Sequence, residues 1–235
     1  MTDPESTHAE EERIRRVYGT RTDGARYSWL TGGQQLIVQG AERGMLGALR
    51  HAGLSTLDES TFLEIGCGSG HWLRAMVQWG ARPDHVVGVD LLASRLLEAQ
   101  ARSARDIRLA ASSGASLPFR AGSFDVVLQS TVFTSILSDD VRRAVAAEML
   151  RVLRPNGLVL WYDFFVNNPR NRDVRRVSKA ELKSLFPGCN VLIRRVTLAP
   201  PLARALAPRI WPLAAALSSI PILCTHYVGT IRRPK

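Results

Sequence analysis

The segment Thr61–Gly70 has the sequence TFLEIGCGSG and decides the fold of the chain. It begins with a short apolar run interrupted by one acid, Glu64, and such a run is typical of a buried parallel strand. Glycines follow at 66, 68 and 70, and they predict a tight turn whose backbone a ligand can approach closely. The next segment, 71–80, has the apolar spacing of a helix that ends at a glycine. Together these features predict a nucleotide-type binding unit.

The glycine spacing and the acid before it narrow the class of ligand. Nicotinamide-binding proteins carry G-x-G-x-x-G, whereas this turn is G-x-G-x-G. A pyrophosphate beside Glu64 would meet like charge, whereas an ammonium group would be attracted to this carboxylate. S-adenosylmethionine carries an ammonium group in its amino acid part and a positively charged sulfur. The stretch therefore favours S-adenosylmethionine, with a nicotinamide as the alternative.

Composition describes an ordinary globular chain. The 235 residues are 46% hydrophobic and 22% charged, which is enough for one well-filled core. Three cysteines, far apart and odd in number, predict neither a disulfide framework nor a metal site, and a reducing, cytoplasmic location is the default. The polar start contains no apolar segment of a signal peptide. We predict a flexible N-terminus over 1–26 and a single domain over 27–235.

Two features raise the question of an anionic partner. The net charge is +10, nearly all from arginines, and these are spread over most predicted helices, which favours dispersed charge over one face that binds nucleic acid. Residues 210–231 contain no Asp, Glu, Lys or Arg, a length that could span a bilayer of ~30 Å. Pro212, Pro221 and Gly229 interrupt this stretch. We therefore predict a helix followed by a core strand, with superficial membrane contact as the alternative.

The rest of the chain alternates between predicted helices and strands. A helix at 34–51 lies in a segment, 27–53, that is expected to cap the ligand pocket. The second strand, at 85–92, ends in Asp90, whose carboxylate can accept both hydroxyls of a ribose or can cap the following helix. Further strands are expected at 106–110, 124–129, 157–165, 190–198 and 222–232. Further helices are expected at 92–104, 138–154, 178–187 and 209–219, the last within a helical insertion at 199–221.

Four motifs in order carry a resemblance to a known family. They are LEIGCGSG (63–70), VGVD (87–90), ASLPF with SFDVVL (115–128) and EMLRVLRPNGLVLWYDF (148–164). With them the chain resembles the class I S-adenosylmethionine-dependent methyltransferases of the small-molecule type, over about residues 60–232. The resemblance implies an α/β fold, a Rossmann-like seven-stranded and mostly parallel sheet with an antiparallel last strand and helices on both faces. It also implies S-adenosylmethionine as cofactor and S-adenosylhomocysteine as product.

The resemblance also implies an acceptor class. A small molecule is expected, such as a secondary metabolite, a quinone, or a lipid or sugar precursor. An RNA or DNA methyltransferase is the alternative suggested by the net charge of +10. A third possibility is a protein that binds the cofactor without catalysis, or a membrane-associated partner protein that uses residues 200–221.

Cofactor residues follow from the resemblance, position by position. Glu64 and Gly66 are expected to hold the amino acid part, with the cofactor lying close to Gly68. Asp90 is expected to bind the ribose. Where the family usually has an Asp for the adenine amino group, this chain has Ser113. The remaining expected contacts are Leu91 on the adenine, Ser113 and Gly114 along its edge, Gln129 at the methionine portion and Tyr27 over the head group.

Candidates for the acceptor side come from one sheet edge. The carboxyl end of the fifth strand and the amino end of an antiparallel last strand meet there. Methyl transfer from a sulfonium mainly requires positioning and exclusion of water, so no catalytic triad is needed. His226 is the best candidate base because imidazole titrates near neutral pH, and a structural histidine is the alternative. The residues expected at this edge are Tyr162, Asp163, Asn167, Asn168 and His226, with Ser130, Thr131 and Phe133 beside them. His71, at a helix start beside the glycine turn, is expected to be non-catalytic.

Overall fold

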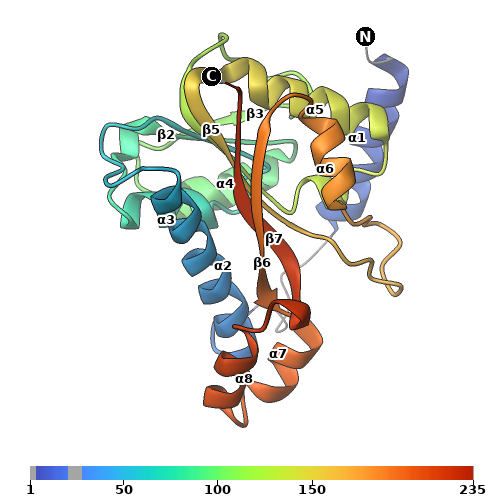
Figure 1. Ribbon diagram of the computed structural model, residues 1–235. Helices are drawn as coiled ribbons and strands as arrows, with labels where there is room; N and C mark the ends of the chain where they lie inside the picture. Colours follow the sequence, from blue (N-terminus) through green and yellow to red (C-terminus); the bar gives the residue numbers. More distant parts are fainter. Residues whose placement is uncertain (1–3, 21–27, 235) are drawn as a thin grey trace.

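The computed structural model describes residues 4–20 and 28–234 and forms one seven-stranded sheet with the order β3-β2-β1-β4-β5-β7-β6 (Figure 1). The strands are β1 (Phe62–Ile65), β2 (Val86–Asp90), β3 (Arg108–Ala111), β4 (Phe124–Ser130), β5 (Leu153–Phe164), β6 (Asn190–Leu198) and β7 (Cys224–Arg232). Strand β7 runs antiparallel to both β5 and β6, and the pairs from β3 to β5 are parallel. This is the Rossmann-like sheet that the sequence predicted.

Helices cover both faces of the sheet (Figure 1). The α-helices are α1 (Pro4–Gly19), α2 (Gly32–His51), α3 (His71–Gln78), α4 (Ala93–Arg102), α5 (Asp139–Val152), α6 (Lys179–Leu185), α7 (Pro200–Leu206) and α8 (Trp211–Leu217). Short 3-10 helices are η2 (Pro83–His85), η3 (Phe133–Ser135) and η4 (Pro221–Leu223). Because side chains alternate along a strand, Phe62 of β1 packs with α2 and α3, whereas Leu63 and Ile65 pack with α5. The core therefore has two apolar layers, one on each side of the sheet.

The N-terminal segment differs from the prediction. A flexible stretch was expected over 1–26, but residues 4–19 form α1, which packs beside α5 (Figure 1). Glu10 is buried, pairs with Arg13 at 2.9 Å and accepts a hydrogen bond from the backbone N–H of Leu137. Arg13 also donates to the carbonyl of Ser135. Polar contacts anchor this helix, so its hydrophobic pattern did not reveal that it docks.

The C-terminal part also differs in detail. One helix was predicted at 209–219, and the structure has two short helices, α7 and α8, followed by η4. Residues 199–223 form a lobe, called here the C-terminal lobe, at the lower end of the molecule in Figure 1. Strand β5 begins earlier than the predicted 157–165, at Leu153, and includes Pro155. In the part of the chain that the structure describes, each helix is too short or too polar to cross a bilayer.

Candidate active site

The glycine turn after β1 is built from three residues in the left-handed region. Gly66, Gly68 and Gly70 have φ of +67°, +52° and +78°, values that L side chains rarely adopt. A Cβ at Gly66 would lie 2.6 Å from Cγ2 of Val132, so protein atoms already fill that side of the turn. A Cβ at Gly68 would meet nothing within 4 Å. The space beside Gly68 is therefore open, whereas the Val132 side chain fills the space beside Gly66.

This turn opens on a cavity of about 1160 Å³ at the carboxyl ends of the parallel strands. Typical sites for one small ligand measure roughly 300–1,000 Å³, so the volume leaves room for a cofactor together with a small acceptor. One end of the cavity is lined by the predicted cofactor residues Gly66, Gly68, Asp90, Leu91, Ser113 and Gly114. The other end is lined by Ser130, Thr131, Phe164, Asn167, Asn168 and His226.

Asp90 closes β2 with both carboxylate oxygens facing backbone donors. Oδ2 accepts a hydrogen bond from the N–H of Gly68 at 2.8 Å, and Oδ1 accepts one from the N–H of Leu92 at 2.9 Å. Burial raises the pKa of this carboxyl above its ordinary value, and the two backbone donors act in the opposite direction. Each oxygen keeps further lone-pair capacity. Asp90 therefore fixes the glycine turn and also presents acceptors to the cavity.

Glu64 lies in the middle of β1 and is 3% exposed. It is not among the residues that line the cavity. Its Oε2 is buried and has no hydrogen-bond partner among the described residues. Burial, followed by the negative charge of Asp90, raises the pKa of the Glu64 carboxyl well above its ordinary range. A buried acid with an unused acceptor is therefore held directly behind the glycine turn.

The loop after β3 supplies another wall at the end of the cavity that the predicted cofactor residues line. The Ser113 hydroxyl accepts a hydrogen bond from the N–H of Ala115 at 3.1 Å. A Cβ at Gly114 would lie 3.0 Å from Cγ2 of Ile65, so this position has little space for a larger residue. The wall thus consists of small residues and a hydroxyl, at the position where the family usually has an acid.

Gln129 is not where the sequence placed it. It was expected to face the cavity, but its side chain is fully buried and does not line it. Its Oε1 accepts a hydrogen bond from the N–H of Val132 at 3.1 Å, and its Nε2 donates to the carbonyl of Tyr162 at 3.4 Å. Gln129 therefore supports the turn after β4. Tyr27, expected over the head group, lies outside the described residues.

Two of the three predicted catalytic residues do not reach the cavity. Tyr162 and Asp163 are neighbours on β5 and point to opposite faces of the sheet, where both are buried. The Tyr162 hydroxyl hydrogen-bonds with the hydroxyl of Thr197 at 2.9 Å, and burial raises its pKa. Asp163 accepts hydrogen bonds from the hydroxyl and the N–H of Thr134 at 2.7 and 3.2 Å. Burial raises the pKa of Asp163 to about 7.

His226 lines the cavity, as expected. Its ring stacks on Tyr162 with centroids 4.9 Å apart, and its Nδ1 lies 3.1 Å from the Thr225 hydroxyl. Burial lowers the pKa of His226 to about 4, so the imidazole is neutral at physiological pH and can accept a proton. His71 lies away from the cavity, 3.7 Å from Glu42, and burial lowers its pKa to about 4.

A family model described as "Methyltransferase domain" matches residues 62–157, which include the glycine turn and Asp90. The chain contains a class I methyltransferase domain. This confirms the family that the sequence resembled, whose methyl donor is S-adenosylmethionine. An uncharacterized protein of Haemophilus influenzae is 32% identical to the chain over 125 residues. That match covers 50% of this chain and 48% of the relative, so it spans about half the length of the curated relative.

Solved structures resemble the chain in fold at low identity. The 1,6-didemethyltoxoflavin-N1-methyltransferase of Burkholderia thailandensis, solved with 1,6-didemethyltoxoflavin and S-adenosylhomocysteine, is 18% identical with a TM-score of 0.64. The match covers 100% of this chain and 92% of that chain. The cyclase SpnF is 15% identical with a TM-score of 0.63, over 100% of this chain and 98% of that chain. These likenesses establish the fold. One of the two proteins that share it, SpnF, is a cyclase.

Sequence reasoning missed the contribution of α1 to the cavity. Glu11, Ile14 and Tyr18 line it from this helix, and the Tyr18 hydroxyl lies 2.6 Å from the hydroxyl of Ser135. Their spacing on a helix was the available signal, but a helix rich in charged residues gave no sign of a docking face. Thr131, which lines the cavity after β4, has φ of +58°, an outlier for a β-branched residue. Such strain is often found at functional sites.

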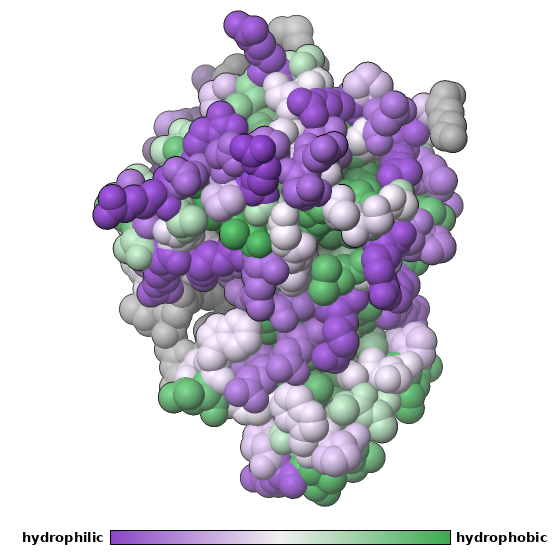
Figure 2. Space-filling view, turned by 90° about the vertical axis from the view of Figure 1, so that its left-hand side faces the viewer, coloured by the Kyte–Doolittle hydropathy of each residue, from purple (hydrophilic) through white to green (hydrophobic). Residues whose placement is uncertain are grey.

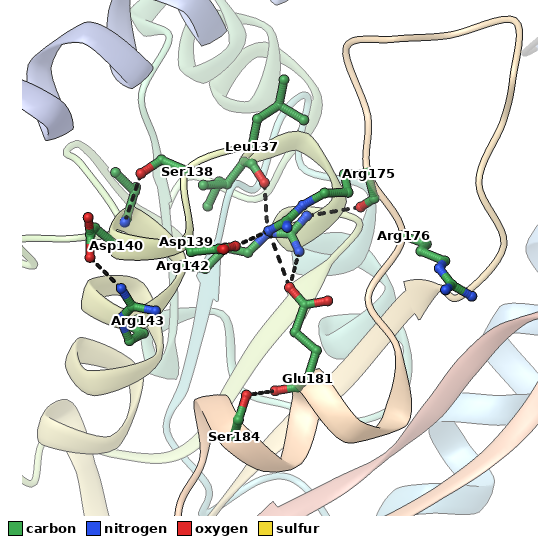
Figure 3. A network of polar contacts seen from close by, with 12 residues as sticks. Leu137, Ser138, Asp139, Asp140, Arg142, Arg143, Arg175, Arg176, Glu181 and Ser184 are labelled. Atoms are coloured by element: carbon green, nitrogen blue, oxygen red, sulfur yellow. Dashed lines mark hydrogen bonds and ion pairs between the residues drawn. The ribbon is translucent and has the colours of Figure 1, made fainter.

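Residues 166–174 form another wall of the cavity, and a polar network anchors the end of this loop (Figure 3). Arg142 of α5 is 0% exposed and donates to the carbonyls of Ile136 and Arg175 at 2.7 and 2.9 Å. It also forms an ion pair with Glu181 of α6. Arg175 itself pairs with Asp139 at the start of α5. Helices α5 and α6 thus hold the base of the loop that carries Asn167 and Asn168.

Proposed function

We propose that this protein transfers a methyl group from S-adenosylmethionine to a small-molecule acceptor by in-line displacement. One observation carries the proposal: the glycine turn, with Asp90 beside it, opens on a cavity of about 1160 Å³ that has room for two ligands. Two details fit this cofactor. The space beside Gly68 is open, so a ligand can lie against the backbone there. The partnerless Oε2 of Glu64 would be satisfied by an ammonium group, directly or through one ordered water.

Each residue has a proposed part in holding the cofactor. Gly68 leaves the backbone bare for the amino acid portion, and Gly66 lines the cavity beside it. Asp90 accepts hydrogen bonds from the ribose hydroxyls, and Leu91 packs on the adenine. Ser113 and Gly114 line the adenine edge with a hydroxyl and main-chain groups. S-adenosylmethionine supplies a methyl group on a positively charged sulfur, which is already a good leaving group.

The acceptor end would position the nucleophile and exclude water. Asn167 and Asn168 offer amide groups for orientation, and His226 offers a neutral imidazole. In the proposed step, the acceptor atom forms a bond to the methyl carbon while the bond from carbon to sulfur breaks. The acceptor's proton passes to His226 and then to solvent, and S-adenosylhomocysteine is released. Tyr162 and Asp163 would act only as supports of this end.

A small molecule fits the acceptor end better than a nucleic acid. Helix α1, the loop 166–174 and α7 all contribute walls to the cavity. Binding of RNA or DNA requires a continuous basic face that neutralises several phosphates. The basic lining residues among those described are Arg95, Arg170 and Arg204, which come from three separate elements.

Calorimetry tests the cofactor assignment first. S-adenosylhomocysteine should bind, and NADH should not. Asp90→Ala should weaken binding by more than about 1 kcal/mol, because hydrogen bonds to the ribose are lost. Asp106→Ala, at an exposed turn residue, is the matched control and should bind as the unmodified protein does. Binding of NADH alone would refute the proposal.

Turnover tests the reaction itself. With methyl-labelled S-adenosylmethionine and a panel of small hydroxylated, amino and quinol acceptors, the label should move to one acceptor class with stoichiometric S-adenosylhomocysteine. Tight cofactor binding with no transfer to any acceptor would instead indicate another use of this fold, as in the cyclase SpnF.

A further inference from the structure

The C-terminal lobe exposes an unusual share of the large apolar side chains. Among the described residues, ten large hydrophobic side chains are exposed, and seven of them lie in this lobe or in the turn just before α2. We call these seven the apolar tip. They are Trp29, Leu30, Leu202, Ile210, Leu213, Ile220 and Ile222. Contiguous apolar surface on a soluble domain usually marks a contact site.

The turn before α2 belongs to the same surface as the lobe. A Cβ at Gly32 would lie 3.4 Å from the backbone of Ala207 and Pro208, and one at Gly33 would lie 2.6 Å from Cα of Arg204. The backbone at Gly32 and Gly33 therefore packs directly on the lobe, so the turn that carries Leu30 adjoins it, whereas the Trp29 ring lies 5.6 Å from the ring of His71 of α3. Figure 2 shows green and pale side chains gathered at the lower end of the molecule, where Figure 1 places α7 and α8.

The two helices of the lobe carry apolar side chains on their outer side as well as on the side that faces the lobe's core. In an ordinary surface helix the large apolar residues face the core. Here the buried residues of α7 and α8 are alanines, Ala203 and Ala214. Leu202 and Leu213 of the same helices point outward, and Ile222 of η4 is 79% exposed. The lobe therefore packs Leu206, Trp211 and Leu217 against its own small core and leaves a second set of apolar side chains exposed.

The charges in and near the lobe indicate what kind of partner it would bind. The protein carries a net charge of +10, and the lobe contains no Asp or Glu. Within the lobe, the charged residues are Arg204 and Arg209. Apolar side chains with a tryptophan, flanked by arginines and free of acids, are the features of segments that lie in the interface of an anionic membrane. The overall positive charge would also steer the protein toward such a surface.

We propose that the apolar tip docks on an anionic lipid surface. The tip would enter the boundary between headgroups and acyl chains, to a depth of roughly 5–10 Å, without crossing the bilayer. Arg209 would lie at the headgroup level. Pro200, Pro201 and Arg204 of the lobe also line the cavity, so docking would bring the acceptor end close to the lipid. This last consequence rests on the proposed function and narrows its acceptor to an amphiphile.

Sedimentation with vesicles tests the docking. The purified full chain should bind vesicles of phosphatidylcholine mixed with phosphatidylglycerol, should bind pure phosphatidylcholine weakly, and should be released by added salt. Ile222→Glu should weaken binding roughly tenfold or more, because a charge replaces an inserted apolar side chain. Arg209→Glu should weaken binding to the anionic vesicles only. Leu97→Glu, at a 67% exposed position on α4, is the matched control and should bind as the unmodified chain does.

Three results would overturn the proposal. The unmodified chain could fail to bind the anionic vesicles, or Ile222→Glu and Leu97→Glu could weaken binding equally. The chain could also self-associate in sedimentation equilibrium, with Ile222→Glu abolishing the dimer, in which case the tip binds a second copy. Calorimetry with S-adenosylhomocysteine should give the same affinity for every variant. Loss of docking and failure of the methyltransferase assignment are therefore measured separately.

Discussion

Replacing Glu64 with glutamine should stabilise the ligand-free protein. The Glu64 carboxyl is buried, its Oε2 has no partner among the described residues, and burial and the charge of Asp90 raise its pKa well above the ordinary value. Glutamine has nearly the same shape and carries no charge. Ionising a buried carboxyl that lacks a partner costs free energy that the neutral amide avoids, so Glu64→Gln should raise the free energy of unfolding near neutral pH by about 1–3 kcal/mol.

The effect should depend on pH with a definite sign. In the unfolded chain, the Glu64 carboxyl titrates near 4.5, and in the folded protein its pKa is higher. Between these two values the folded state holds a proton that the unfolded state has lost, so the stability of the unmodified protein falls as pH rises. The advantage of Glu64→Gln should therefore grow above pH 4.5 and level off beyond the folded pKa. Below 4.5 both states are protonated, and the pH dependence should vanish.

Urea unfolding across this range, for both proteins, measures the difference directly. Other buried groups titrate in the same range and cancel in the difference between the two proteins, except Asp90, whose charge interacts with that of Glu64. Glu59→Gln, at an exposed position, is the matched control and should shift stability by less than about 0.5 kcal/mol at every pH. Calorimetry should then show a loss of affinity for S-adenosylhomocysteine of about 10- to 100-fold in Glu64→Gln, since a charged hydrogen bond is removed. A difference curve that is flat with pH, or a variant less stable than the unmodified protein, would show that the carboxylate is ionised and satisfied.

Three further predictions concern the turn, the support of the acceptor end and the base. Gly68→Ala should lower the free energy of unfolding by about 1–2 kcal/mol because of its positive φ, and it should reduce the affinity for S-adenosylhomocysteine. Gly66→Ala should lower it further, since the added Cβ would also clash with Val132. Equal melting temperatures of the two variants would contradict this prediction. Thr134→Val should lower the free energy of unfolding by about 1–3 kcal/mol, because Asp163 loses a hydroxyl donor. The loss should be larger at about pH 8 than at about pH 5, because the pKa of Asp163 is about 7. Urea titrations at both pH values measure the order, and the reverse order would contradict the prediction. His226→Gln should lower kcat about a hundredfold and leave the affinity for S-adenosylhomocysteine unchanged. In the unmodified protein, protonation of His226 should not slow the reaction between about pH 8 and about pH 5.5, since the pKa of His226 is about 4. An unchanged kcat in the variant would show that His226 is not the base.

The sequence by itself determined the sheet and the placement of the glycine turn and Asp90 at the cavity. Its signals there are local: an apolar run makes a buried strand, alternating glycines make a left-handed turn, and an acid at the end of the next strand must lie beside that turn. Gly66, Gly68 and Asp90 therefore lie together at the cavity in the structure, as predicted. The meeting of β5 and β7 at His226 also followed, because antiparallel pairing joins the end of one strand to the start of the next.

Only the tertiary structure decided which side chains reach the cavity. Gln129, Tyr162 and Asp163 stand at the expected edge, yet each is buried by elements distant in the sequence, and a hydrogen-bond partner holds each one there. The docking of α1 depends on Glu10 meeting the backbone near Leu137, more than a hundred residues away. Burial and pKa depend on what packs around a group, and that packing is set by contacts between remote segments that no local pattern encodes.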